Sequence, residues 1–112
     1  MKTLLMITSR DPSRDPKVAE MVRIAAGLGS WGQVKVDIAL FGPAIRAIDR
    51  YPEELMDGHL IAAHLAAIPE HGGEIWVEEK AHESVGLDAT VVFQASSRAE
   101  ILARPYTCSM TF

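Results

Sequence analysis

Residues 72–86, GGEIWVEEKAHESVG, contain the pattern that decides the fold of this chain. Two glycines end one element, residues 74–77 then predict a short buried strand, and two glutamates, Glu78 and Glu79, follow that strand. In an open α/β sheet, the groups that bind ligands gather at the carboxyl ends of the strands. We therefore expect any functional site of this protein to lie around Glu78.

Length and composition favour one small globular domain over residues 1–112. With 48% hydrophobic and 23% charged residues, a chain of this size buries about two thirds of the surface that its unfolded form exposes. No stretch reaches the roughly 20 apolar residues that span a bilayer, and the apolar run before Ser9 is shorter than the about 7 to 15 residues of a signal peptide. We expect a cytoplasmic protein without a membrane span.

Charge, cysteine content and glycine patterns argue against several classes of partner and binding site. The chain has 11 Lys and Arg against 15 Asp and Glu, a formal net charge of −4, so nucleic acid is not an expected partner. The single cysteine, Cys108, excludes an internal disulfide and a cysteine-pair zinc site. The glycine-rich patterns of nucleotide-binding loops do not occur. We expect no cofactor and no metal ion.

Strand patterns alternate with helix patterns along the chain. Strands are predicted at residues 2–8, 34–41, 74–77, 89–93 and 106–112. Helices are predicted at residues 16–28, from about 57 to 69, at 79–85 and at 97–103, with a short helical turn at 44–48. This alternation predicts right-handed crossovers and a mainly parallel sheet covered on both faces. The expected fold is a three-layer α/β/α sandwich with five strands.

Helix boundaries are marked by capping residues. Asp15 followed by Pro16 is typical of a helix start, because aspartate accepts free backbone N–H bonds and proline suits the first helical position. Ser97 with Glu100 three residues later has the capping-box pattern. Pro69 lacks an N–H group, so it is expected to end or kink the second long helix.

Three stretches carry a resemblance to a known family. They are the opening KTLLMITS strand with its loop and helix, the segment from a helix through His-Gly-Gly and EIWV to Gly86-Leu87, and the ending YTCSMTF. With them the chain resembles the DsrE/DsrF-like family of small sulfur-relay proteins, which includes TusD-type subunits. The resemblance implies a homo-oligomer, a trimer or hexamer, and a possible sulfur-relay protein as partner.

The resemblance fails at one position. In that family the residue directly after the EIWV-like strand is commonly a cysteine that accepts sulfur as a persulfide, and here that residue is Glu78. A carboxylate cannot carry a sulfane sulfur. The family also contains subunits without the cysteine, which support an assembly rather than catalyse. We interpret this chain as a non-catalytic or regulatory member of a sulfur-relay or related assembly.

Two alternatives remain open for a chemical role. Glu78 is a candidate general acid or base, if desolvation in a crevice raises its pKa. Cys108 is a candidate sulfur carrier, and some TusD-type subunits look similar at this point. We expect this thiol to be buried and inert; the carrier role requires it to be exposed, with Arg104 as its evident activator.

Topology predicts where a ligand would bind. If the sheet is parallel, the loops after the first three strands meet in one crevice. The residues expected to line it are Ser9, Arg10, Phe41, Gly42 and Glu78. Backbone N–H groups of the helix after residues 8–14 would also favour an anion there, although a plain polar loop explains the same residues.

The histidines do not predict a metal site. Glu78, Glu79 and His82 have helical spacing, which a solvated polar face explains equally well. His64 falls in the apolar stripe of the second long helix, together with Leu60, and is expected to be a core or interface histidine.

Overall fold

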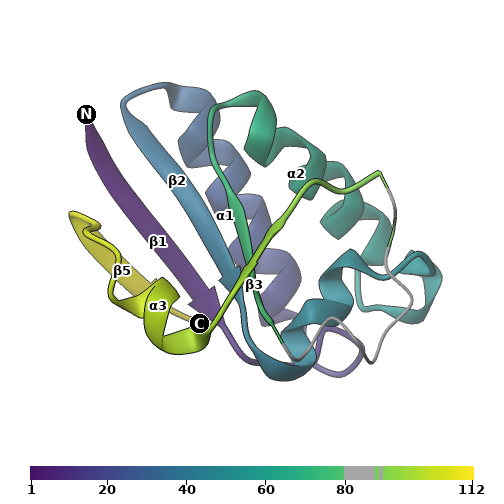
Figure 1. Cartoon of the computed structure of the whole chain (residues 1–112). Coiled ribbons are helices and arrows are strands. Elements are labelled where there is room, and N and C mark those ends of the chain that lie inside the picture. Colours follow the sequence, from purple (N-terminus) through teal and green to yellow (C-terminus); the bar gives the residue numbers. More distant parts are fainter. Residues whose placement is uncertain (80–87, 89) are drawn as a thin grey trace.

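The computed structural model describes residues 1–79, 88 and 90–112 and contains five parallel strands (Figure 1). Their order in the sheet is β4-β3-β2-β1-β5. The strands are β1 (Lys2–Thr8), β2 (Val34–Leu40), β3 (Ile75–Glu78), β4 (Gln94–Ser96) and β5 (Cys108–Thr111). The helices are α1 (Lys17–Trp31), α2 (Gly58–Glu70) and α3 (Arg98–Leu102), with 3₁₀ turns η1 (Gly42–Ile48) and η2 (Pro52–Glu54). The predicted parallel α/β sheet is confirmed.

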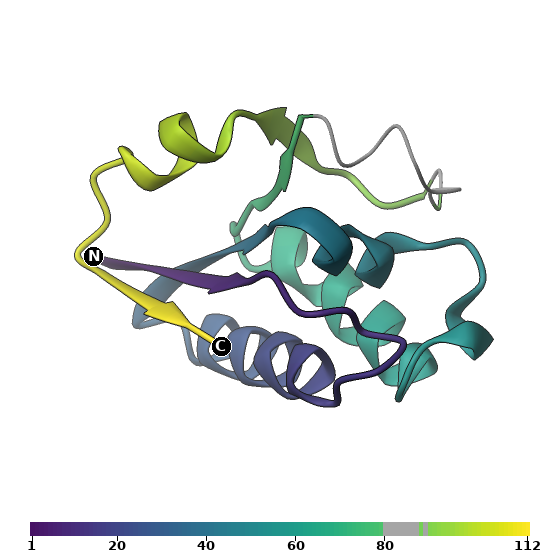
Figure 2. The same cartoon turned by 90° about the horizontal axis from the view of Figure 1, so that it is seen from below.

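Helices lie on both faces of the sheet, but unequally. Figure 2 shows α1 and α2 on one side and α3 on the other. The first side holds the larger core, in which Met21 and Val22 of α1 and Leu65 of α2 pack against the sheet. On the second side, Ile101 of α3 packs on the side chains of Leu5, Ile7, Ala39, Phe41 and Trp76. The third layer is therefore one helix of five residues in the described part of the chain.

The doubled glycine of the opening stretch is required where α2 turns into β3. Gly72 has a φ of 80°, in the left-handed region that favours glycine. At Gly73, a Cβ atom would lie 2.2 Å from the carbonyl oxygen of Val36. Because β3 must approach β2 this closely at its start, no other residue fits at position 73 without a shift of the backbone.

The capping predictions are confirmed in part. Asp15 Oδ1 accepts a hydrogen bond from the backbone N–H of Lys17 at 2.9 Å, and Ser97 Oγ accepts one from the N–H of Glu100 at 3.1 Å. The Glu100 carboxylate accepts instead from the Ser96 hydroxyl at 2.9 Å. Helix α1 continues three residues beyond its predicted end, until Gly32 adopts a left-handed φ of 79°.

The fourth strand lies later than predicted. Residues 90–93 are not in a strand, Ala89 lies outside the described residues, and β4 begins at Gln94. The reason is local, because Asp88 Oδ1 accepts hydrogen bonds from the N–H and hydroxyl of Thr90 at 2.9 and 2.7 Å. This turn competes with the β propensity of the following valines.

Other boundaries also shift. The fifth strand begins at Cys108, two residues later than predicted, and α2 continues through Pro69 to Glu70. Most of the predicted helix at 79–85 lies outside the described residues. Leu60 was expected to be buried but is 56% exposed. Within the described part of the chain, we find no helix with the length and apolar character needed to cross a membrane.

A buried polar contact ties the C-terminal segment to the second face of the sheet. Asp37 of β2 is 1% exposed, and its carboxylate accepts hydrogen bonds from the Tyr106 hydroxyl and from the Glu74 N–H, the latter at 2.8 Å. Burial, reinforced by the Asp37 carboxylate, raises the pKa of Tyr106 to about 12. The phenol therefore remains a proton donor throughout the physiological range.

We expect Tyr106→Phe to lower the free energy of unfolding by about 1.5 to 3 kcal/mol, because it removes a hydrogen bond to a charged, buried acceptor. Urea denaturation at neutral pH measures this loss. The matched control is Tyr51→Phe, which removes a hydroxyl from the exposed tyrosine of the chain and should change stability by less than about 0.5 kcal/mol. Equal effects of the two substitutions would contradict the assignment.

Candidate functional site

The carboxylate of Glu78 joins three elements at the carboxyl edge of the sheet. It accepts a hydrogen bond from the Gly42 N–H at 2.8 Å and two from Arg98, at 3.2 Å from Nε and 3.0 Å from Nη2. Gly42 begins η1, and Arg98 begins α3. The Glu78 side chain is 26% exposed. The contacts therefore bind the end of β3 to its neighbours on both sides.

Arg98 is held by a second contact. Its guanidinium lies over the ring of Phe41, 4.7 Å from the centroid. The Ser97 cap fixes the start of α3, which places Arg98 beside the end of β3. An arginine suits this position, because its planar fork pairs with a carboxylate while its face stacks on an aromatic ring.

Electrostatics keep Glu78 ionised. Hydrogen bonds from Arg98 lower its pKa below the ordinary glutamate value, and the Gly42 N–H and the Arg98 charge add to this, while partial burial opposes it. The acid–base alternative required desolvation to raise the Glu78 pKa, but the donors outweigh that effect and the pKa is lowered. A carboxylate with a lowered pKa and three donors directed at it is a poor proton carrier near neutral pH.

The predicted crevice is assembled only in part. Phe41, Gly42 and Glu78 are together, and the Phe41 N–H donates to the carbonyl of Thr8 at 2.9 Å, so the ends of β1 and β2 meet as the topology predicts. Ser9 is exposed at this edge. Arg10 contacts Asp15 instead, with Nη1 2.9 Å from Oδ2. The basic charge predicted for an anion site is therefore paired.

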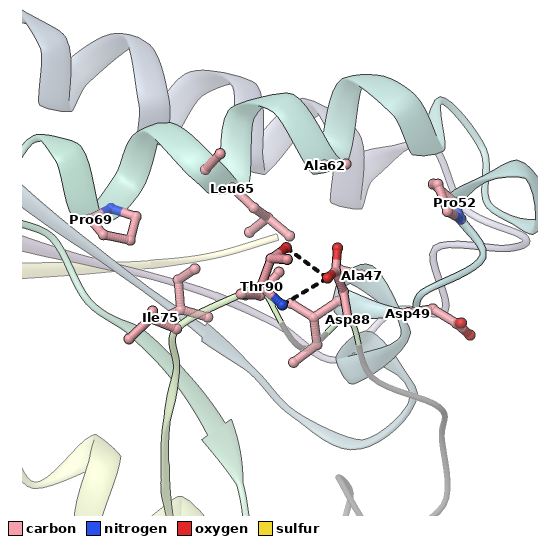
Figure 3. Close-up of a pocket in the computed structure, with 13 residues that line it drawn as sticks. Ala47, Asp49, Pro52, Ala62, Leu65, Pro69, Ile75, Asp88 and Thr90 are labelled. Carbon is pink, nitrogen blue, oxygen red and sulfur yellow. Dashed lines mark hydrogen bonds between the residues drawn. The ribbon is translucent and has the colours of Figure 1, made fainter.

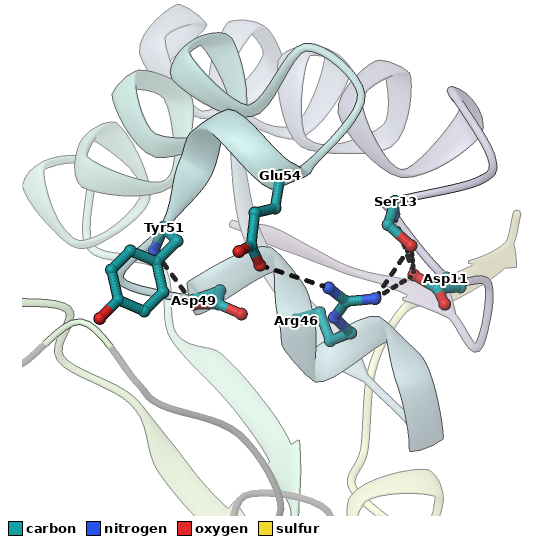
Figure 4. A network of polar contacts seen from close by, with 6 residues as sticks. All are labelled: Asp11, Ser13, Arg46, Asp49, Tyr51 and Glu54. Atoms are coloured by element: carbon teal, nitrogen blue, oxygen red, sulfur yellow. Dashed lines mark hydrogen bonds and ion pairs between the residues drawn. The ribbon is translucent and has the colours of Figure 1, made fainter.

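A second polar network lies at the same edge, after β1 (Figure 4). Arg46 of η1 places Nη1 2.9 Å from Ser13 Oγ and 3.4 Å from Asp11 Oδ1, and Nη2 3.8 Å from Glu54 Oε2. Partial burial acts to raise the pKa of Asp11, but hydrogen bonds from Ser13 and the nearby Arg46 charge outweigh it and lower that pKa. The network fixes η1 against the loop after β1.

The thiol of Cys108 is exposed, so the expectation of a buried cysteine is wrong. Strand β5 is an edge strand, and every residue from Cys108 to Thr111 is exposed. Arg104 is not positioned as its activator, because the guanidinium lies over the Trp76 ring, 4.3 Å from the centroid.

The histidines supply no metal centre in the part of the chain that the structure describes, where no three metal-binding side chains cluster. His82 lies outside the described residues. His64 is half-buried, and its Nδ1 has no hydrogen-bond partner among the described residues.

Sequence reasoning missed Arg98 and Arg46. A signal for Arg98 existed, because the capping box at Ser97 fixes the first turn of α3 directly after the strand that pairs with β3. Arg46 offered no such signal. Its partners Asp11 and Ser13 are more than 30 residues away in the chain, and only the fold brings them together.

These features define an α/β protein with a five-stranded parallel sheet and a carboxylate, rather than a thiol, at the end of its third strand. Among solved structures, the fold is similar to that of the YchN protein from E. coli, with a TM-score of 0.78, 14% sequence identity and coverage of 100% of both chains. At this identity the similarity shows the shared fold. No protein-family model and no curated protein matches the chain.

We expect Glu78→Gln to lower the free energy of unfolding by about 1 kcal/mol at neutral pH, through the loss of a paired charge. Because the folded-state pKa of Glu78 is lowered, its contribution is present above the ordinary glutamate pKa and is lost as the pH falls through the folded-state value. Urea denaturation at about pH 7 and about pH 3 should therefore show the difference between Glu78→Gln and the parent protein shrinking at the lower pH.

Glu79→Gln is the matched control for this prediction. Glu79 is the exposed neighbour, and the hydrogen bond found there uses its backbone N–H, which donates to Ser96 O at 3.0 Å. A difference for Glu78→Gln that stays constant with pH, or that Glu79→Gln reproduces, would show that the paired charge is not the cause.

Proposed function

We propose that this chain is a DsrE/DsrF-like protein that acts as a non-catalytic or regulatory member of a sulfur-relay or related assembly. Two findings support the proposal. The fold is shared over its whole length with YchN, a protein of the DsrE/DsrF-like fold. The position at which the resemblance implies a sulfur-accepting cysteine is Glu78, which cannot form a persulfide.

The observation that carries the proposal is the bonding of the Glu78 carboxylate. Three donors from Gly42 and Arg98 converge on it, so the group is engaged in holding β3, η1 and α3 together. An acceptor residue must present a free nucleophile to its partner. At this site the Glu78 side chain instead holds three elements of the fold together, as expected for a subunit that supports an assembly.

The surface supports self-association. Several large apolar side chains are exposed, among them Trp31 at 65%, Leu60 at 56% and Met110 at 46%. Exposed apolar side chains on an edge strand and on helix surfaces are features that interfaces between subunits cover. The resemblance implies a trimer or hexamer, and we propose a homo-oligomer of this kind.

Native mass spectrometry of the purified protein tests the assembly. We expect one dominant species at three or six times the protomer mass, persisting on dilution to low micromolar concentration. Leu60→Glu is the variant to compare, because it places a charge on an exposed apolar position of α2 without touching the core. A protein that is monomeric at all concentrations would overturn the proposed homo-oligomer.

A second candidate function is a sulfur carrier that uses Cys108, and the exposure of this thiol favours it. In such a transfer the Cys108 thiolate attacks the terminal sulfur of a donor persulfide. The new S–S bond forms on Sγ, the donor's S–S bond breaks, and the donor leaves as a thiolate. No external oxidant or reductant is consumed in the exchange.

Incubation with a low-molecular-weight persulfide separates the two candidates by intact mass. If the chain is non-catalytic, the mass of one sulfur atom should be added to Cys108 no faster than to free cysteine, since Arg104, the activator expected from the sequence, lies over the Trp76 ring instead. Cys108→Ser identifies the modified residue. Loading many times faster than that of free cysteine, and lost in Cys108→Ser, would reject the non-catalytic role in favour of the carrier.

A further inference from the structure

A cavity of about 260 Å³ lies between η1, α2, Asp88 and residues 90–92 (Figure 3). In Figure 3, Ala62, Leu65 and Pro69 of α2 lie along one side of it, and Asp88 and Thr90 face them. The Glu78 site does not contribute to the described wall. The cavity is therefore separate from the site discussed above.

The inner wall of this cavity is apolar. Ile48, Leu65 and Ile75 belong to three different elements, and each is 1% exposed. Toward the opening, α2 presents the small side chains of Ala62 and Ala66, which leave room between the helix and the opposite segment. Concave, mostly apolar surfaces with a few polar groups are the usual form of small-molecule sites.

The charged groups of the described wall are both carboxylates, those of Asp49 and Asp88. Asp88 Oδ1 accepts from Thr90, and Asp49 Oδ1 accepts from the Tyr51 N–H at 3.0 Å, so each carboxylate is oriented through one oxygen. Hydrogen bonds from the Thr90 hydroxyl and N–H lower the pKa of Asp88, so it is ionised at neutral pH.

No cation among the described residues neutralises this wall. Arg50 follows Asp49 in the chain, but its guanidinium lies over the Tyr51 ring, 4.9 Å from the centroid, and it is not among the residues that line the cavity. The described wall therefore combines an apolar interior with two carboxylates. The carboxylates would repel a ligand anion. A cation attached to an apolar group would instead place its charge beside the carboxylates and its apolar part against the apolar interior.

We propose that this cavity binds a small organic cation, an ammonium group on a compact apolar body, with the apolar part against Ile48 and Leu65 and the ammonium at Asp88. The volume is just below the range of about 300 to 1,000 Å³ that is common for drug-sized ligands, so the ligand is smaller than these. This binding activity goes beyond the assembly role proposed above and does not depend on it.

Three probes of the same size and different charge test the proposal: benzylamine, benzyl alcohol and benzoate. Titration into the isotope-labelled protein at neutral pH, followed by amide NMR shifts, should show saturable binding of benzylamine with shifts centred on Leu65 and Thr90. Benzyl alcohol should bind about tenfold more weakly, because it lacks the charge-assisted hydrogen bond. Benzoate should not bind. Binding of benzoate as strong as that of benzylamine, or saturable binding of none of the probes, would overturn the proposal.

Substitutions in the cavity wall test whether benzylamine binds in this cavity. Ala62→Leu places a larger side chain in the opening and should abolish benzylamine binding, and Ala66→Leu serves the same purpose should the first variant fail to fold. Asp88→Asn should weaken benzylamine binding several-fold and leave benzyl alcohol binding unchanged. Glu20→Gln, which removes the same charge from the exposed surface of α1, is the control. Undiminished binding to a folded Ala62→Leu or Ala66→Leu variant would place the site elsewhere and reject the inference.

Discussion

In the part of the chain that the structure describes, one short helix, α3, covers the second face of the sheet. Polar contacts hold this helix in place and organise much of the structure. Arg98, its first residue, is bonded to Glu78 at the carboxyl edge of the sheet. Tyr106, shortly after its end, donates to Asp37 nearer the opposite edge. Between them, Ile101 is fully buried. Five residues bury little apolar area, so α3 depends on the polar contacts near its two ends. The longer helices α1 and α2 do not depend on such contacts, because they bury more apolar area.

This arrangement explains why a carboxylate at position 78 is compatible with the fold. A thiol there would leave the Arg98 guanidinium and the Gly42 N–H without the acceptor that they now share. A glutamate supplies two oxygens and satisfies both. Glu78 therefore has a structural role at this position, in agreement with the non-catalytic role that we propose for the chain.

The features predicted correctly from the sequence are those that local patterns determine. The sheet, the apolar face of α1 and the Ser97 cap follow from periodicity and from hydrogen bonds that span a few residues. The fourth strand was misplaced because Asp88 starts a turn just before the β-branched run. Cys108 was expected to be buried because free cysteines commonly pack as small hydrophobic residues, but strand order, which local patterns do not encode, places it at an edge.

In the candidate site, too, some features could be predicted from the sequence and others could not. Topology alone placed Phe41, Gly42 and Glu78 together, because parallel strands end at one edge. It could not predict that Arg10 would turn to Asp15, or that Arg98 would reach Glu78, since these choices depend on the directions of individual side chains. The cavity beside α2 was not anticipated either, because the small size of Ala62 and Ala66 has meaning only once the opposite segment is in place.

The pairing of β5 with β1 has a consequence for the order in which the sheet is completed during synthesis. Thr3 and Thr107 are hydrogen-bonded although 104 residues separate them. Until β5 has been synthesised, β1 has β2 on one side and an unprotected row of backbone groups on the other. Contacts of such long sequence separation form slowly, and a bare strand edge is open to pairing with other chains. Strand β5 therefore protects the open edge of β1. The nascent chain is most prone to aggregation while that edge is still unpaired.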